Sequence, residues 1–211
     1  MWQGKIKKCK ITIMITITNK EYIDNTVIIE GEGDITIGNN VIIKNNAIIQ
    51  NDNKQFTLKI DDNVLIDDDV EIIGANIITN NVHIGGDARI YGTSKITKYS
   101  EVVGNAIISG NVNISYGCHI GGDAIIKDNA NIDNNVYVYN NAQIYDNANV
   151  NDYVKVYGNA KIYGLSSIRK IYNSKKFMLI YGNAKIFGNS YITFHNAINI
   201  CGKARLKNIT L

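Results

Sequence analysis

Isoleucine or valine recurs at every sixth residue through most of the chain. Counting in steps of six from Ile60 reaches Ile or Val at every position as far as Ile192, with one exception at Ser174. Two residues earlier stands, in most units, a small or aliphatic residue, as Ala160 stands before Ile162. Because side chains alternate across a strand, these two residues point to one side and the polar residue between them to the other. The pattern predicts one short strand per unit, with its apolar side chains inside.

The other positions of each unit are rich in Gly, Asn and Asp. Pairs such as Gly104-Asn105 and Asn134-Asn135 tolerate the left-handed backbone angles that a sharp corner requires. The six-residue period and this punctuation exclude a helix over the same range. Each unit is therefore predicted to be a strand followed by a tight corner, which accounts for the Asn content without glycan attachment or catalysis.

The step of six is strict from about residue 56 to 192 and looser outside that range. The step holds in two upstream blocks, formed by Ile11, Ile17, Ile23 and Ile29 and by Ile37, Ile43 and Ile49. Small insertions are predicted at 30–34, 51–55 and 193–196, after which Ile200 and Leu206 resume the step. We predict one domain over 1–211, with irregular N-terminal coils at 1–55, regular coils at 56–192 and a C-terminal cap at 193–211.

The units IGNNVI from Ile37, IGGDAR from Ile84 and IGGDAI from Ile120 resemble those of the hexapeptide-repeat, left-handed parallel β-helix superfamily. The style is closest to uncharacterised hexapeptide-repeat proteins with units of the GNAxIYG type, and more distantly to bactofilin-like filament formers. The resemblance implies an all-β triangular solenoid in which three units close one coil of about 18 residues, so that 211 residues make about eleven coils.

Residues eighteen apart should then stack on one face, which places His83, Glu101 and His119 in one outward column. These are metal-ligand types, and the histidine spacing resembles in part that of γ-class carbonic anhydrases. That family has a further His five residues after the second, where this chain has Ala124. We predict no metal site, and keep the three residues as the weaker alternative.

The same spacing places Tyr145, Tyr163 and Tyr181 in one exposed column, with Tyr139 and Tyr157, beside Tyr137, on the neighbouring face. We predict that these five column residues form an interface for self-association or a protein partner, the alternative being that stacking only stabilises the surface. The phrase Gly-Asn-Ala-Lys-Ile-aromatic starts at Gly158 and again at Gly182, 24 residues later. One coil plus one unit separates the copies, which predicts that they lie on adjacent faces.

Composition limits the partners and the compartment. The net charge of +3, with lysines spread along the chain, argues against a nucleic-acid partner. Three cysteines without a CxxC pair indicate a reducing, cytoplasmic location, and Cys118 is expected in the core, away from His119. The alternation in ITIMITIT (residues 11–18) predicts a strand and not a secretory core, and no stretch is long enough to span a membrane. The Asn, Ile, Lys and Tyr content also fits an AT-rich phage genome and a virion-associated protein.

The regularity and the scarcity of loops favour a non-enzymatic structural or interaction protein without a cofactor, a rigid rod that displays columns of side chains. The alternative implied by the resemblance is a trimeric acyltransferase that uses coenzyme A, for example acetyl-CoA, or an acyl carrier, with His83 or His119 as general base between subunits. A further alternative is a glycan-binding face.

Overall fold

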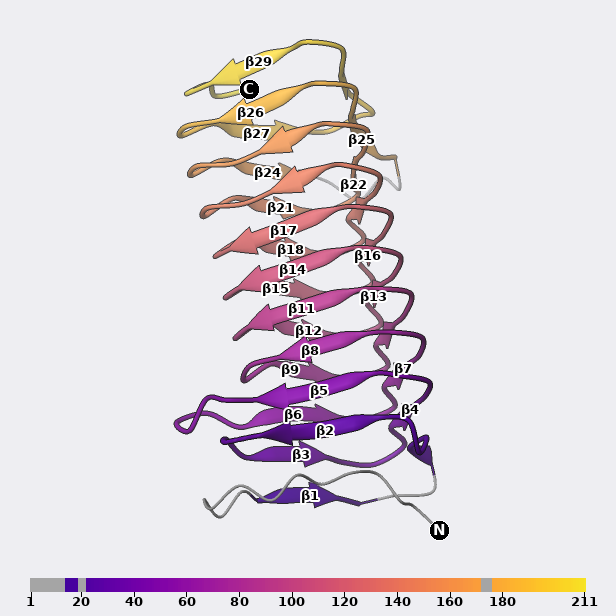
Figure 1. Ribbon diagram of the computed structural model, residues 1–211. Coiled ribbons are helices and arrows are strands. Elements are labelled where there is room, and N and C mark those ends of the chain that lie inside the picture. The colour runs from indigo at the N-terminus through magenta and orange to yellow at the C-terminus, as the bar shows by residue number, and fades with distance from the viewer. Residues whose placement is uncertain (1–13, 19–21, 172–175) are drawn as a thin grey trace.

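The computed structural model describes residues 14–18, 22–171 and 176–211. These residues form three parallel sheets that run side by side along one long solenoid (Figure 1). Sheets A and C contain ten strands each and sheet B contains nine, so the described part of the chain makes about ten coils instead of the eleven expected from length. The predicted all-β solenoid is confirmed.

The strands are two to four residues long, as expected for a unit of six with a corner. Sheet A consists of β1 (Ile15–Ile17), β3 (Ile35–Ile37), β6 (Leu58–Asp61), β9 (Ile77–Thr79), β12 (Lys95–Thr97), β15 (Asn113–Ser115), β18 (Asn131–Asp133), β21 (Asn149–Asn151), β24 (Ser167–Lys170) and β27 (Tyr191–Phe194). Sheet B consists of β4 (Ile42–Ile43), β7 (Leu65–Ile66), β10 (His83–Ile84), β13 (Glu101–Val102), β16 (His119–Ile120), β19 (Tyr137–Val138), β22 (Val154–Val156), β25 (Met178–Ile180) and β28 (Asn199–Ile200). Sheet C consists of β2 (Ile28–Gly31), β5 (Ile48–Asn51), β8 (Glu71–Ile73), β11 (Arg89–Gly92), β14 (Ile107–Gly110), β17 (Ile125–Asp128), β20 (Gln143–Ile144), β23 (Lys161–Ile162), β26 (Lys185–Phe187) and β29 (Arg205–Lys207).

From β3 onward the chain visits sheets A, B and C in turn, so that each circuit is one coil. In Figure 1 the near strands of sheet C run from right to left while the chain climbs toward its C-terminus, which is the sense of a left-handed coil. Such coils depart from the usual right-handed crossover between parallel strands. The corners adopt the predicted left-handed angles; Asn134 and Asn135 both have φ of 58°.

The isoleucine columns form the core. Successive coils place Ile60, Ile78 and Ile96 in register on sheet A, and all three are fully buried. Ala88, Ala106 and similar small residues fill the remaining interior. Since burying one Ile side chain is worth roughly 1.5–3 kcal/mol, each added coil contributes through three such residues and through its pairing with the coil below.

The structure shows longer steps at the three positions where insertions were predicted. Ile17 pairs with Ile37 and Ile37 with Ile60, which are longer steps than eighteen, and Ile180 pairs with Ile200. The second insertion is held by the buried Asn51, whose Nδ2 donates to the carbonyl oxygens of Asp34 at 2.8 Å and Phe56 at 3.0 Å.

A fourth insertion shifts the columns near the C-terminal end. Val156 pairs with Ile180, 24 residues later, because the path from β24 to β25, counted between paired positions, is six residues longer than the path from β21 to β22 one coil earlier. The Lys170 ammonium closes the base of this segment by donating to the Lys176 carbonyl oxygen at 3.1 Å. The eighteen-residue step predicted here is therefore wrong; Ser174, the exception in the Ile series, lies outside the described residues.

The two copies of the repeated phrase consequently stack directly on each other. Lys161 pairs with Lys185 on sheet C, so the prediction of adjacent faces is wrong. Gly158, with φ of +71°, lies so close to the next coil that a Cβ there would be 3.1 Å from the backbone nitrogen of Gly182. The phrase is a corner and a strand, repeated on consecutive coils.

The N-terminal prediction is confirmed where the structure describes it. Residues Ile15–Ile17 of ITIMITIT form strand β1, paired with β3. Ile11 and Cys9 lie outside the described residues. Within the described part of the chain, no helix is long and apolar enough to cross a membrane.

Candidate acid–base site and surface columns

The outward face of sheet B carries the predicted histidine column, His83, Glu101 and His119. Strands β10, β13 and β16 each present one polar residue outward and one aliphatic residue inward, and parallel pairing aligns His83 with Glu101 and Glu101 with His119. The shared column is confirmed. Each of these side chains is half-buried, because coils above and below cover its flanks.

Glu101 joins the two histidines through separate oxygens. Its Oε1 lies 3.1 Å from His83 Nδ1, and its Oε2 lies 2.8 Å from His119 Nδ1. The other ring nitrogen of His83, Nε2, lies 3.0 Å from Asp67 Oδ1. The sequence reasoning missed Asp67. It directly follows the inward Ile66 and so also points outward, a signal that the alternation contains.

These contacts shift two pKa values in opposite directions. Partial burial disfavours the charged form of His83, but the hydrogen bonds and charges of Asp67 and Glu101 outweigh it, so the pKa of His83 lies above its ordinary value. The hydrogen bond from His119 lowers the pKa of Glu101, burial opposes it, and His83 lowers it further. The column is therefore a chain in which carboxylates and imidazoles alternate and hydrogen bond to one another.

The two histidines differ in whether a ring nitrogen remains without a hydrogen-bond partner among the described residues. Both ring nitrogens of His83 face carboxylates. For His119, Nδ1 is held by Glu101, and among the described residues no hydrogen-bond partner meets Nε2. Its side chain is 35% exposed. A carboxylate at one imidazole nitrogen with the other nitrogen open is the arrangement of an oriented general base.

An aromatic cluster extends the column beyond His119. The Tyr137 ring stacks on the His119 ring with centroids 4.7 Å apart and planes 9° apart. Phe177, from the inserted segment, meets Tyr137 edge-on at 5.4 Å, and Tyr139 lies tilted at 6.0 Å. Lys155 Nζ lies 4.4 Å from the Phe177 centroid and 5.1 Å from that of Tyr137. The contact of Phe177 with Tyr137 was not predicted from the sequence, because Phe177 lies in a segment that does not follow the repeat.

The tyrosine columns are real but differently composed. Tyr145 stacks on Tyr163 at 4.9 Å with planes 5° apart, and Tyr163 stacks on Phe187 at 5.1 Å. Tyr181 instead stacks on Tyr157 at 4.9 Å. The placement of Tyr181 above Tyr163 is therefore wrong, because the inserted unit moves every later residue on by one face. We call Tyr145, Tyr163 and Phe187 the aromatic column.

The stacking also decides which ring surfaces are open. Rings with nearly parallel planes at about 5 Å cover one another's faces and leave their edges outward. Lys127 covers the open end at Tyr145, with Nζ 5.1 Å from the ring centroid. The aromatic column thus offers little flat surface on which a sugar ring stacks.

Cys118 is buried, as predicted, and its thiol donates to the Ser115 carbonyl oxygen at 3.0 Å. Burial raises the pKa of this thiol to about 12. The prediction that Cys118 and His119 face opposite sides is confirmed, and the pair is excluded as a nucleophile and base.

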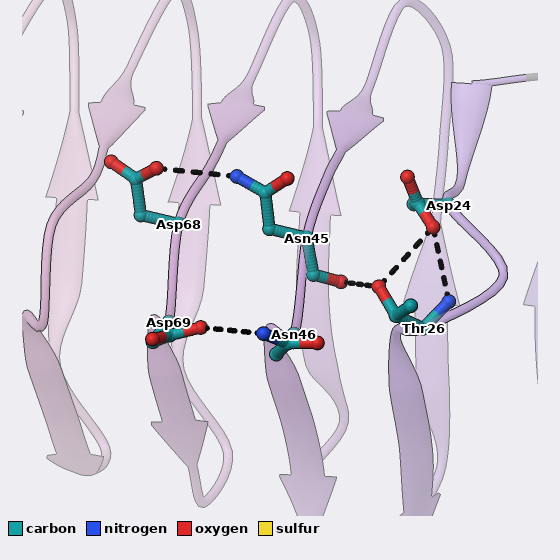
Figure 2. A pocket seen from close by; sticks show the side chains of 6 residues that line it. All are labelled: Asp24, Thr26, Asn45, Asn46, Asp68 and Asp69. Atoms are coloured by element: carbon teal, nitrogen blue, oxygen red, sulfur yellow. Dashed lines mark hydrogen bonds between the residues drawn. The ribbon is translucent and has the colours of Figure 1, made fainter.

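A polar hollow lies at the corner between sheets B and C near the N-terminal end, and Figure 2 shows its lining. Asn45 donates to Asp68 at 3.2 Å and Asn46 to Asp69 at 2.9 Å, while the Thr26 backbone N–H donates to Asp24 at 3.1 Å. These carboxylates stabilise consecutive corners. In the described part of the chain, no group of three or more His, Cys, Asp or Glu side chains is arranged to hold a metal ion.

The chain is a hexapeptide-repeat β-solenoid. No family model and no curated protein matches it. Among solved structures, it is similar to UDP-N-acetylglucosamine acyltransferase from Campylobacter jejuni, with a TM-score of 0.40 and 15% identity over 84% of this chain and 70% of that one. It is also similar to UDP-N-acetylglucosamine acyltransferase from Francisella novicida, with a TM-score of 0.37 and 17% identity over 77% of this chain and 62% of that one. Because both TM-scores lie below 0.5, we draw nothing from either structure about what this chain does.

Proposed function

We propose that the protein is an acyltransferase-like enzyme in which His119 is the general base and Glu101 orients it. The observation that carries the proposal is the contact of Glu101 with His119 Nδ1 at 2.8 Å, which directs the second ring nitrogen away from the carboxylate. His83 is not the base in this proposal, since both its nitrogens are engaged.

In the proposed reaction, His119 Nε2 accepts a proton from the hydroxyl or amine of an acceptor. The acceptor then attacks the carbonyl carbon of an acyl thioester, the carbon–sulfur bond breaks, and His119 returns the proton to the leaving thiolate. Glu101 stabilises the imidazolium between these steps, as a carboxylate does beside a catalytic histidine. General-base assistance of this kind is worth about 100-fold or more in rate.

The surroundings of His119 suit a thioester of coenzyme A or an acyl carrier. Tyr137 and Phe177 supply apolar surface beside the base, and Lys155 supplies a positive charge next to both rings for a phosphate. An outward face of a solenoid excludes little water by itself. The proposal therefore includes self-association, with a partner subunit covering sheet B, and a trimer is the expected assembly.

Matched substitutions of the two histidines test the proposal. We expect His119→Gln to lower thiol release from acetyl-CoA, with hydroxylamine as acceptor, by about 100-fold or more. His83→Gln removes the same chemical group two positions away in the column, beyond Glu101, and should stay within about threefold of the unaltered protein. Equal losses in both variants contradict the assignment. If light scattering shows a monomer or dimer and calorimetry detects no binding of acetyl-CoA, the proposal that the protein is an enzyme is wrong.

A second candidate is the non-enzymatic rod, which the aromatic column favours. Three stacked rings on a regular surface rigidify it and present edges to a partner. Replacing Tyr145, Tyr163 and Phe187 with Ser should then abolish assembly or partner binding while circular dichroism shows a folded solenoid. If assembly survives, the column only stabilises the surface.

A further inference from the structure

Two consecutive parts of the solenoid carry opposite charge. Residues 153–211 contain ten Lys and Arg and no Asp or Glu, whereas residues 21–152 contain nineteen Asp and Glu against seven Lys and Arg. Together with five Lys in residues 1–20, the two stretches sum to the net charge of +3, which conceals this contrast. The lysines are spread along the chain as expected, but the net charge is not, because the carboxylates that neutralise the lysines stop at Asp152.

On sheet C the positive end becomes a column. Parallel pairing aligns Lys161 with Lys185 and Lys185 with Arg205, on strands β23, β26 and β29. Three cations thus follow one another at the strand spacing of about 4.8 Å. We call these three residues the cation column. Like charges placed directly opposite each other on a sheet repel, and among the described residues no carboxylate forms a salt bridge with these three side chains.

The cation column lies beside the aromatic column on the same flat face. Lys185 and Phe187 are two residues apart on β26, and Tyr163 directly follows β23, two residues after Lys161, so each pair points outward together. At the C-terminal end, Arg205 and Lys207 lie 5.8 Å and 6.0 Å from the Phe187 centroid. The face is a positive strip along the solenoid axis with an aromatic border.

We propose that this strip binds a linear polyanion of phosphate groups. Regularly spaced cations along a straight edge match a ligand whose charges repeat along a chain. Because the rings of the aromatic column cover one another, bases have no open ring face to stack on, and recognition rests on charge. Nucleic-acid backbone and inorganic polyphosphate share this chemistry.

A second copy of the chain fits the strip less well, although its residues 21–152 are acidic. Its carboxylates lie largely at corners, and several are already engaged by the next coil. Asp68 accepts from the Gly86 backbone N–H at 3.2 Å, and Asp146 accepts from that of Gly164 at 2.9 Å. A flat column of three carboxylates that would match the cation column is not found among the described residues of sheet C.

The test measures binding of the full chain to two probes, a fluorescently labelled thymidine oligonucleotide and long-chain sodium polyphosphate. If three charges contribute, raising the salt from about 50 mM to about 200 mM should weaken oligonucleotide binding roughly 20-fold. The variant Lys161→Gln, Lys185→Gln, Arg205→Gln should bind at least about tenfold more weakly at low salt and reduce the salt slope by about 2.

The matched control is Lys44→Gln, Lys59→Gln, Lys95→Gln, which removes three charges from the acidic part of the solenoid. It should bind like the unaltered chain. Binding to both probes supports recognition by charge alone, and binding to one identifies the source of the phosphates. Absence of binding to both probes at low salt, or equal weakening in the two triple variants, overturns the proposal. So does salt-sensitive dimerisation that the first triple variant abolishes, because the partner is then a second copy.

Discussion

The outward faces of sheets B and C are built on the same backbone register and carry opposite kinds of electrostatics. On sheet B, carboxylates alternate with imidazoles in the series Asp67, His83, Glu101 and His119, and each side chain hydrogen bonds to its neighbour. On sheet C, Lys161, Lys185 and Arg205 repeat one charge. Stacking at about 4.8 Å strengthens whichever interaction the sequence places there, attractive or repulsive.

The comparison separates two kinds of candidate surface. In the histidine column, the ring nitrogens and carboxylates hydrogen bond to one another, and one ring nitrogen, His119 Nε2, remains open for chemistry. The cation column does not satisfy itself and is completed only by a ligand from outside. In a regular solenoid, a candidate site is therefore a residue that differs from the rest of its column. The residues above and below it determine which of its polar atoms are already hydrogen bonded and which are open.

The largest expected effect comes from breaking the interior that both faces share. Ile126 is fully buried on β17, so Ile126→Asp places a carboxylate without a partner in the core. We expect a loss of at least about 4 kcal/mol in the free energy of unfolding, measured by urea denaturation. Lys127→Asp changes the adjacent outward residue and should cost less than about 1 kcal/mol. A folded, equally stable Ile126→Asp variant contradicts the inward assignment.

A double-mutant cycle tests the corrected aromatic column. Truncating Tyr163 and Phe187 to Ala should show a coupling of about 0.5–1.5 kcal/mol in unfolding free energy, because the rings stack at 5.1 Å. The pair Tyr163 and Tyr181 should couple by less than about 0.3 kcal/mol, since the inserted unit places them on different faces. A larger coupling for Tyr163 and Tyr181 than for Tyr163 and Phe187 would contradict the aromatic column and support the original prediction that Tyr181 stacks on Tyr163.

The pH dependence of stability tests the histidine column. The raised pKa of His83 gives stability that is present below its ordinary value of 6.5 and is lost as pH rises through the folded pKa. The lowered pKa of Glu101 gives stability present above 4.5 and lost as pH falls through its folded pKa. The column should therefore stabilise most between these two values, by less than about 1 kcal/mol because the groups are half exposed.

Glu101→Gln removes the charge that both histidines share. Melting temperatures measured from pH 4 to 9 should show a flatter profile for this variant than for the unaltered chain. Lys59→Gln, another exposed charge, should keep the original shape. An unchanged profile in Glu101→Gln shows that the contacts contribute no net stability.

The smallest expected effect relieves the cation column. Lys185→Glu places a carboxylate between Lys161 and Arg205 and should raise the free energy of unfolding by about 0.5 kcal/mol at low salt, with the gain vanishing in high salt. Lys185→Gln should gain less. A loss of stability in both variants would show that Lys185 contributes through packing and not through charge.

Much of the solenoid follows from the sequence because a six-residue unit specifies itself locally. Apolar residues at two alternate positions and Gly or Asn at the corner make the strand, its inward side and its turn. His83, Glu101 and His119 could be placed in one column because every unit between them has the same length. Asp67 was equally accessible, since it follows an inward residue.

The exception at Ser174 marks the segment before Phe177 as irregular, but its effect on the faces that follow could not be predicted in the same way. Six added residues keep the step of six intact, so Ile168 and Ile180 read as regular positions of one series. The three faces of a coil have the same local sequence pattern, so the residues of a single unit do not indicate whether it belongs to sheet A, B or C. Face identity depends on how many units close the coil, which is settled by packing.

The sequence by itself determined the strand, the inward isoleucines and the corners, because these depend on side-chain alternation and backbone freedom within six residues. Only the tertiary structure decided that Tyr181 lies on Tyr157, that Phe187 completes the aromatic column, and that Phe177 reaches Tyr137 beside His119. Those contacts depend on which unit leaves the solenoid so that the next one stays in register, and register between coils is a long-range property of the chain.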